Sequence, residues 1–163
     1  KIFKIPYKKI KILIHPNSYI HCLLKFNNGL TKLIAHDTTM RIPIFNTLYK
    51  DSIKVIKSNE VDISKLNNLN LNNVDEKKYP MIKILNMLPQ KESLFETVLV
   101  SSNDELVDQF LNKKIGFMDI YYKLNKFLKE KEFYKFKKKQ PKKIEDITKL
   151  ANYVRLKLRA KSI

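Results

Sequence analysis

The chain has 163 residues, 44% of them hydrophobic, which is typical of one or two small globular domains with a buried core. No run approaches the roughly 18 consecutive apolar residues that span a bilayer, and a single cysteine, Cys22, excludes an internal disulfide and a cysteine-based zinc cluster. The chain begins at Lys1 and shows no signal-peptide pattern, so we expect a processed or excised portion of a longer product.

Basic residues outnumber acidic ones by 33 to 16, giving a net charge of +17, and the excess is uneven. Residues 114–163 contain 16 Lys or Arg and 5 Asp or Glu. Such a surface attracts nucleic acid or anionic lipid by counterion release and long-range steering. The alternative is a solvated surface shaped by codon bias, because only three basic residues are arginine, whose fork suits phosphate recognition. Nucleic-acid binding through this Lys-rich segment therefore remains one of two interpretations.

The N-terminal portion has the pattern of an antiparallel sheet. Lysine and isoleucine alternate over residues 9–14, which predicts a half-buried strand, and His-Pro-Asn-Ser at 15–18 interrupts it. A second strand is predicted over 19–26 and a return strand over 30–35. Asn-Asn-Gly at 27–29 is a favourable hairpin turn between them, because Asn and Gly accept positive φ at little cost.

A helix is predicted from Thr39 or Met40 onward, with Pro43 in its first turn, where a missing N–H costs little. The polar stretch 51–79 has few periodic apolar residues and includes a Leu/Asn-rich patch. We expect a connector there, with short strands at most.

From Pro80 the apolar residues take helical spacing. Ser101 or Ser102 is predicted to cap a helix ahead of the acidic residue Asp104, and Gly116 is predicted to end a helix.

Two further amphipathic helices are predicted over 119–128 and 144–158. Between them, the basic and aromatic sequence of residues 131–143 is expected to be an exposed linker, although its aromatic residues could also stack on single-stranded nucleic acid.

The predicted fold class is α+β, with an antiparallel sheet portion followed by a C-terminal α-helical bundle. The expected division is a sheet and helix portion at 1–50, a connector at 51–79 and a helical domain at 80–163.

Two histidines in the stretch IHPNSYIHC raise the question of a reactive site, because histidine titrates near neutral pH. No carboxylate accompanies His15 and His21 nearby, and their spacing across a proline is not a standard ligand spacing. Cys22 is expected to point to the opposite strand face from His21. With only Gly29 and Gly116, no Gly-rich phosphate loop can form. The residues alone predict no catalytic set.

The same stretch resembles a segment of the 1-deoxy-D-xylulose 5-phosphate reductoisomerases, written I-H-P-Q-S-x-x-H-S, then a D-G-S hairpin, then P-D-M-R-x-P-I. Further along, EVDISKL resembles that family's P-L-D-F-x-x-L, and YPMIKI resembles Y-P-C-L-K-L. VLVSSNDELVDQFLNKKIGFMDI resembles the A-L-N-A-A-N-E segment through the I-x-F-x-D-I turn. These motifs keep one order and cover nearly all of residues 9–128.

The resemblance implies the last two-fifths of an enzyme that makes 2-C-methyl-D-erythritol 4-phosphate in the non-mevalonate isoprenoid route. That family uses NADPH and Mg²⁺ or Mn²⁺, usually as a homodimer, and the resemblance suggests a plastid or apicoplast-type organelle. The Rossmann domain, the metal carboxylates and the substrate flap belong to the preceding part of the family sequence. The resemblance therefore implies no cofactor or metal site in this chain and no catalysis by it alone, with a second copy or the N-terminal reductoisomerase domain as its partner.

Three residues match positions at the edge of the family's substrate pocket. Ser18 and His21 match the serine and second histidine of H-P-Q-S-x-x-H, and Met40 matches the methionine that lines the apolar side of the pocket. Each also has a structural interpretation, with His21 as a hydrogen-bonded sheet residue and Met40 as a core residue at a helix start.

Several positions depart from the family pattern. Thr38 and Thr39 replace Pro-Asp, residues 50–51 replace Trp-Pro, residues 101–104 replace Ala-Ala-Asn-Glu, and Glu92 stands where glycine is expected. Two interpretations follow: part of an active enzyme, or a non-catalytic paralogue retained as a dimerisation or binding scaffold for RNA or a large assembly.

Overall fold

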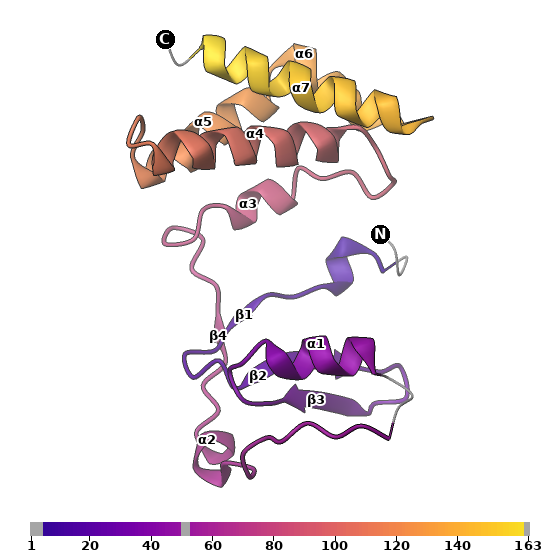
Figure 1. Ribbon diagram of the computed structural model, residues 1–163, viewed down its shortest axis with the longest axis vertical. Coiled ribbons are helices and arrows are strands. Elements are labelled where there is room, and N and C mark those ends of the chain that lie inside the picture. The colour runs from indigo at the N-terminus through magenta and orange to yellow at the C-terminus, as the bar shows by residue number, and fades with distance from the viewer. Residues whose placement is uncertain (1–4, 50–52, 162–163) are drawn as a thin grey trace. The chain divides into compact units, whose positions relative to one another are not determined.

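The computed structural model describes residues 5–49 and 53–161 (Figure 1). The chain divides into two compact units, one formed by Ile12–Val74 and the other by Lys1–Lys11 together with Asp75–Ile163. The first carries small antiparallel sheets and the second is mainly helical, which confirms the predicted α+β class. The expected division into 1–50, 51–79 and 80–163 stays a prediction.

The first unit contains the predicted hairpin. Strands β2 (Ile20–Lys25) and β3 (Thr31–Ala35) pair antiparallel. Gly29 has φ +88° in the turn, a conformation that glycine adopts without steric cost. The Leu30 N–H donates to the side-chain oxygen of Asn28 at 3.1 Å, which closes the turn.

The strand predicted over residues 9–14 is much shorter. Residues Tyr7–Lys9 form a 3₁₀ turn, and β1 covers Leu13–Ile14, where it pairs with β4 (Asn72–Asn73). Ile10 and Ile12 are exposed. The alternating pattern predicted too long a strand, because a strand extends only as far as its partner, and β4 has only two residues to pair with.

Helix α1 (Arg41–Leu48) carries Pro43 in its first turn, as predicted. Helix α2 (Ile63–Asn67) was not predicted, because residues 51–79 were expected to hold short strands at most. Asp62 starts this helix, since its carboxylate accepts the backbone N–H of Lys65 at 3.1 Å.

The second unit begins its helices with α3 (Ile82–Leu85) and α4 (Phe95–Leu111). The predicted cap at Ser101 or Ser102 is wrong, because both serines are buried inside α4. Ser102 donates to the carbonyl oxygen of Val98 at 2.6 Å, so its hydroxyl is satisfied within the helix.

Gly116 precedes the first residue of helix α5 (Phe117–Leu128) and caps its start, whereas it was predicted to end the preceding helix. The carboxylate of Asp119 accepts the Gly116 N–H at 2.9 Å, which satisfies a donor at the helix start. After α4 the chain turns instead at Lys113, with φ +58°. The prediction of Gly116 as a helix end is therefore wrong.

The segment predicted to be an exposed linker forms α6 (Lys131–Tyr134) and a 3₁₀ helix, η2 (Lys135–Lys138). Phe133 is fully buried, and its ring stacks on that of Phe127 with centroids 4.1 Å apart. The expectation fails because Phe133 lies in the core and Phe136 packs against it, which the charged neighbours in the sequence conceal.

Helix α7 (Ile144–Ala160) packs with α5 on α4 to enclose the core (Figure 1). The buried apolar residues of this core are Ile84, Leu94, Phe95, Val98, Leu106, Ile120, Leu124, Phe127, Leu128, Phe133, Leu150, Val154 and Leu158. Ile144, the first residue of this predicted amphipathic helix, is exposed, so the apolar side of α7 contacts the core only in its later turns. Among the described residues, no helix has the length and apolarity needed to cross a bilayer.

Candidate functional site

The three residues predicted at a pocket edge lie at one end of the β2–β3 hairpin. Because the strands are antiparallel, the start of β2 lies beside the end of β3, with Ile20 opposite Ala35. Ser18 lies two residues before the start of β2, His21 lies within it, and Met40 follows β3 at the start of α1. The fold therefore brings three separated sequence positions to one region, while their role there stays a prediction.

A β-bulge places His21. Ile20 pairs with Ala35 and Cys22 pairs with Ile34, so His21 is the extra residue on β2. An extra residue bends the strand and changes the direction of its side chain, a device common near functional sites. His21 is exposed, whereas Cys22 is half-buried.

The ring of His21 stacks on that of His36, with centroids 3.7 Å apart and an interplanar angle of 10°. Nε2 of His21 also lies 3.3 Å from the backbone carbonyl oxygen of His36. Nδ1 of His36 lies 2.6 Å from the carbonyl oxygen of Asp37. The His36 N–H donates to the carbonyl oxygen of Tyr19 at 3.2 Å, which continues the strand pairing past the bulge.

His15 has a different neighbour. Its Nδ1 lies 3.2 Å from the carbonyl oxygen of Asn70, and its Nε2 is buried without a hydrogen-bond partner among the described atoms. The structure thus stacks His21 on His36, a contact that the sequence interpretation, centred on His15 and His21, did not consider.

Ser18 and Met40 occupy exposed positions. Ser18 has φ +49°, and its N–H donates to the carbonyl oxygen of His15 at 3.1 Å in the turn before β2. Met40 is 70% exposed within the described part of the chain. The alternative interpretation of Met40 as a core residue is therefore wrong.

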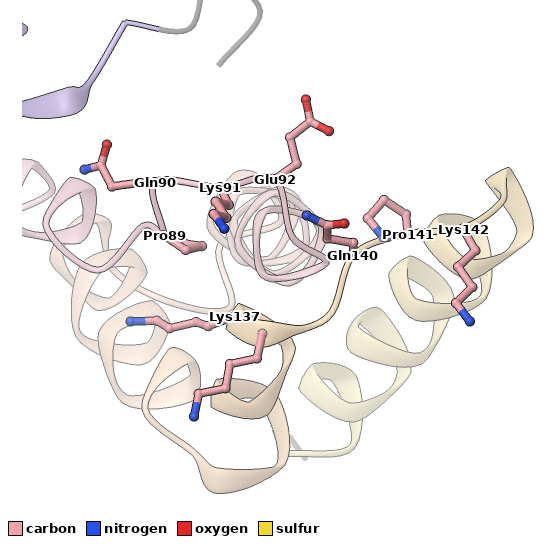
Figure 2. Close-up of a pocket in the computed structure, with 9 residues that line it drawn as sticks. Pro89, Gln90, Lys91, Glu92, Lys137, Gln140, Pro141 and Lys142 are labelled. Atoms are coloured by element: carbon pink, nitrogen blue, oxygen red, sulfur yellow. The ribbon is translucent and has the colours of Figure 1, made fainter.

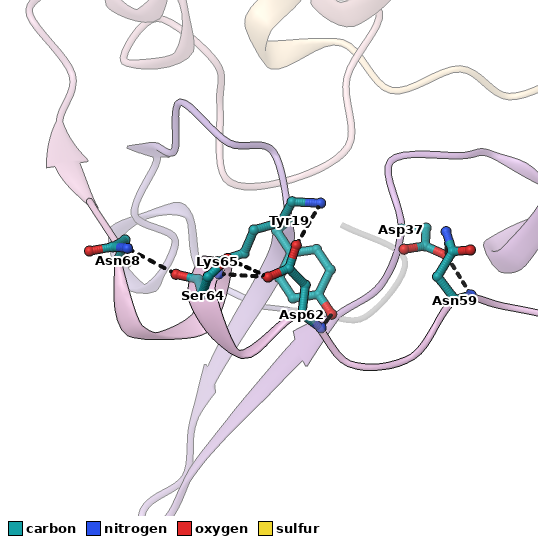
Figure 3. A network of polar contacts seen from close by, with 7 residues as sticks. All are labelled: Tyr19, Asp37, Asn59, Asp62, Ser64, Lys65 and Asn68. Carbon is teal, nitrogen blue, oxygen red and sulfur yellow. Dashed lines mark hydrogen bonds and ion pairs between the residues drawn. The ribbon is translucent and has the colours of Figure 1, made fainter.

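Beside Met40 lies an open hollow of about 560 Å³. Its lining residues are Asp37, Thr38, Thr39, Arg41, Ile42, Ile56, Lys57, Ser58 and Asn59. The Asp37 carboxylate accepts both the backbone and side-chain N–H groups of Asn59 at 3.0 Å (Figure 3). This clamp fixes one wall to the other, and Arg41 and Lys57 add positive charge.

A second group of polar contacts joins the connector to the start of β2 (Figure 3). The Asp62 N–H donates to the Tyr19 hydroxyl at 3.4 Å, and the Ser64 hydroxyl donates to the Asp62 carboxylate at 2.6 Å. Hydrogen bonds from Ser64, and then from the backbone and side chain of Lys65, lower the pKa of Asp62 to about 2. These bonds stabilise the ionised form.

The helical unit contains another open hollow, of about 570 Å³, formed by the loop at 89–92 and by the end of η2 with the residues that follow it (Figure 2). Its lining residues are Pro89, Gln90, Lys91, Glu92, Lys137, Lys138, Gln140, Pro141 and Lys142. The Leu94 N–H donates to the carbonyl oxygen of Lys139 at 2.7 Å, which ties the segments together. Lys137 lies over the ring of Tyr134, with 4.2 Å from Nζ to the centroid.

The described residues do not fit a metal ion or a dinucleotide. Within 5–49 and 53–161, no group of three His, Cys, Asp or Glu side chains is arranged to hold a metal. The two glycines of the sequence cannot build a Gly-rich phosphate loop.

Comparison with known proteins decides the family. Residues 36–157 match the model of the DXP reductoisomerase C-terminal domain, which is most of the chain. The chain belongs to the 1-deoxy-D-xylulose 5-phosphate reductoisomerase family. The resemblance read from the motifs is confirmed.

Two reductoisomerases illustrate the similarity in sequence. The 1-deoxy-D-xylulose 5-phosphate reductoisomerase of Pelagibacter ubique is 52% identical over all 163 residues, which cover 42% of that protein. The same-named protein of Aquifex aeolicus is 30% identical over 97% of this chain and 40% of its own length. The chain thus spans about two-fifths of these relatives.

Solved reductoisomerase structures share the fold. The enzyme from Zymomonas mobilis in complex with NADPH has a TM-score of 0.80 and 25% identity, covering 99% of this chain and 41% of that one. A reductoisomerase with fosmidomycin and magnesium has a TM-score of 0.84 and 24% identity, with coverage of 99% and 41%.

Sequence reasoning missed His36 and the Asp37–Asn59 clamp. His36 is the third histidine of the chain and directly precedes Asp37-Thr38-Thr39-Met40, which was a usable signal. The bulge that brings His21 onto it was not readable, because alternation along β2 does not reveal an extra residue.

Proposed function

We propose that this chain is the C-terminal part of a reductoisomerase that converts 1-deoxy-D-xylulose 5-phosphate into 2-C-methyl-D-erythritol 4-phosphate in the non-mevalonate isoprenoid route. The observation that carries the proposal is the 52% identity to the Pelagibacter ubique reductoisomerase, which extends over the whole chain. Retention of the pocket-edge residues at one end of the hairpin supports an active enzyme over a scaffold.

In this proposal Ser18, His21 and Met40 edge the substrate pocket of the complete protein. His21 and Met40 are exposed, and Ser18 lies in the adjoining turn, so all three are accessible to a ligand. The hollow beside Met40 carries Arg41 and Lys57, whose positive charge suits a phosphorylated substrate.

NADPH and Mg²⁺ or Mn²⁺ are the proposed cofactors of the complete protein. The Zymomonas mobilis structure contains NADPH, and a further reductoisomerase structure contains magnesium with fosmidomycin. Because the described residues fit neither group, we propose that residues 1–163 do not catalyse the reaction alone.

A homodimer is part of the same proposal. The β2–β3 sheet exposes the cross-strand pair Leu23 and Leu33, at 39% and 41%. An apolar two-stranded sheet is marginally stable in water unless more protein covers it. A second copy, or the N-terminal part of the reductoisomerase, would supply that cover.

The test is turnover by the full-length protein. We expect NADPH consumption that requires 1-deoxy-D-xylulose 5-phosphate and Mn²⁺ and that fosmidomycin inhibits. Residues 1–163 alone should show no binding when titrated with NADPH. A full-length protein that is folded and binds NADPH but shows no turnover would favour a non-catalytic paralogue, and NADPH binding by the fragment would overturn the proposed division of sites.

The lysine-lined hollow of Figure 2 favours one second candidate, a scaffold that binds RNA through its basic half. Lys137, Lys138 and Lys142 are among the residues that line it, where they could contact phosphates. Changing all three to Gln should weaken RNA binding and reduce its salt dependence. The matched control changes Lys83, Lys123 and Lys126 to Gln. Equal effects of the two triple variants, or binding insensitive to salt, would contradict a specific site.

A plastid-type location stays a prediction of the motif resemblance. The comparisons with the Pelagibacter ubique and Aquifex aeolicus relatives give it no support.

A further inference from the structure

His21 lies at an irregular point of β2, so a residue directly opposite it on β3 cannot hold its ring in place. The bulge between Ile20 and Cys22 removes the direct cross-strand partner of His21. The side chain is exposed, and an exposed imidazole without contacts would sample several rotamers. The support that the structure provides comes from His36.

His36 holds the ring of His21 through two contacts. The imidazole planes stack at 3.7 Å with an interplanar angle of 10°, which restricts tilt. The His36 carbonyl oxygen lies 3.3 Å from Nε2 of His21, which restricts rotation within the plane. Together these contacts define both the plane and the direction of the ring.

The carbonyl contact also selects a tautomer. A carbonyl oxygen can only accept a hydrogen bond, so Nε2 of a neutral His21 must carry the proton. Nδ1 then holds the lone pair. By the same argument, the contact between Nδ1 of His36 and the Asp37 carbonyl oxygen, at 2.6 Å, places the His36 proton on Nδ1.

His36 is itself fixed from both sides. Its N–H donates to the carbonyl oxygen of Tyr19, and its ring is tied to the Asp37 carbonyl oxygen. Asp37 is in turn held by the two hydrogen bonds from Asn59. A rigid support of this kind is what a side chain needs when its orientation affects ligand binding.

We propose that His36 is a positioning residue for His21, holding its ring in the Nε2–H tautomer so that Nδ1 is the acceptor offered to a hydroxyl group of the sugar-phosphate substrate. The proposal rests on the proposed function, because it assigns the pocket edge to His21. It adds a residue that the family motifs of this chain do not contain.

The experiment compares two variants of His36 in the full-length protein. His36→Phe keeps a flat ring for stacking and keeps the backbone carbonyl, whereas His36→Ala keeps only the carbonyl. We expect His36→Ala to lower kcat/KM for 1-deoxy-D-xylulose 5-phosphate by about tenfold, because misplacement of a binding group is costly. His36→Phe should stay within roughly threefold of the unchanged protein. His15→Ala is the matched control and should show neither effect.

The second readout is the tautomer of His21, measured by ¹⁵N NMR on protein labelled at histidine and assigned by the signals lost in His21→Gln. We expect protonation at Nε2 in the unchanged protein and in His36→Phe. In His36→Ala we expect a mixture of tautomers, because without the stacked ring the His21 imidazole is free to turn away from the carbonyl oxygen at residue 36. Protonation at Nδ1 in the unchanged protein would overturn the proposal, as would full activity of a folded His36→Ala.

These readouts separate the two proposals. If the unchanged protein binds NADPH without turnover, the proposed function fails. The NMR measurement would still show whether His36 fixes the orientation and tautomer of the His21 ring. If His36→Ala does not fold, the tautomer of the unchanged protein and the activity of His36→Phe decide.

Discussion

Arg159 on α7 donates through Nε to both carboxylate oxygens of Glu105 on α4, at 3.0 and 2.9 Å. The Glu105 side chain is only 4% exposed, whereas that of Arg159 is 61% exposed. Burying a carboxylate without a partner is energetically costly. Helix α7 therefore stabilises α4 in two ways, by pairing the charge of Glu105 and by apolar packing.

Replacing Arg159 by Gln should lower the midpoint of thermal unfolding, because it leaves the buried carboxylate of Glu105 without its guanidinium. The hydrogen bonds and charge of Glu105 raise the pKa of Arg159, so the guanidinium stays charged throughout the usual pH range. The matched control is Arg155→Gln, which breaks a 3.4 Å pair with the exposed Asp104 and should change the midpoint less. Equal midpoints for both variants would contradict the account.

Asp62 should titrate at a pKa of about 2, held there first by the hydrogen bond from Ser64. Because the folded pKa lies below the ordinary value of 3.8, the stability from these bonds is present above about pH 3.8 and is lost as the pH falls through 2. Ser64→Ala should raise the Asp62 pKa toward 3.8, measured by ¹³C NMR of the carboxyl group. Ser58→Ala is the control and should leave it unchanged. An Asp62 pKa near 3.8 in the unchanged protein would show that the network does not form.

Asp119→Ala should destabilise the helical unit by roughly 0.5–1 kcal/mol, because the Gly116 N–H at the start of α5 loses its acceptor. Urea denaturation measures the change. Lys126→Ala, an exposed change later in the same helix, should have little effect because lysine and alanine are both good helix formers. If Gly116 ended a helix instead, Asp119→Ala would have no larger effect than this control.

Phe133→Ala should destabilise the helical unit by roughly 3–5 kcal/mol, because the ring is fully buried against Phe127. Tyr134→Ala, at a residue that is 49% exposed, should cost clearly less. Chemical denaturation of both variants compares them. Small and similar losses would be expected of an exposed linker and would contradict the observed packing.

Local conformational preferences were readable from the sequence. The hairpin turn followed from Gly29, which adopts positive φ, and the start of α1 followed from Pro43, which fits a first helical turn. In both cases one residue has a backbone preference that does not depend on its surroundings: glycine tolerates positive φ, and proline fixes φ near the helical value.

Features set by tertiary packing were not readable. Ser102 has the chemistry of a cap, but its small side chain is buried within α4 and bonds its own helix. Phe133 lies in a basic segment yet belongs to the core. At the candidate site, the motif located His21, whereas its contact with His36 depends on an extra strand residue that periodicity does not show.

The most direct test of the central claim, that this chain edges the substrate pocket of a reductoisomerase, is kcat/KM of full-length His21→Gln beside His15→Gln. With NADPH, Mn²⁺ and 1-deoxy-D-xylulose 5-phosphate, we predict a loss of at least roughly tenfold for His21→Gln and little change for His15→Gln. An unchanged kcat/KM in His21→Gln, or equal losses in both variants, would contradict the assignment.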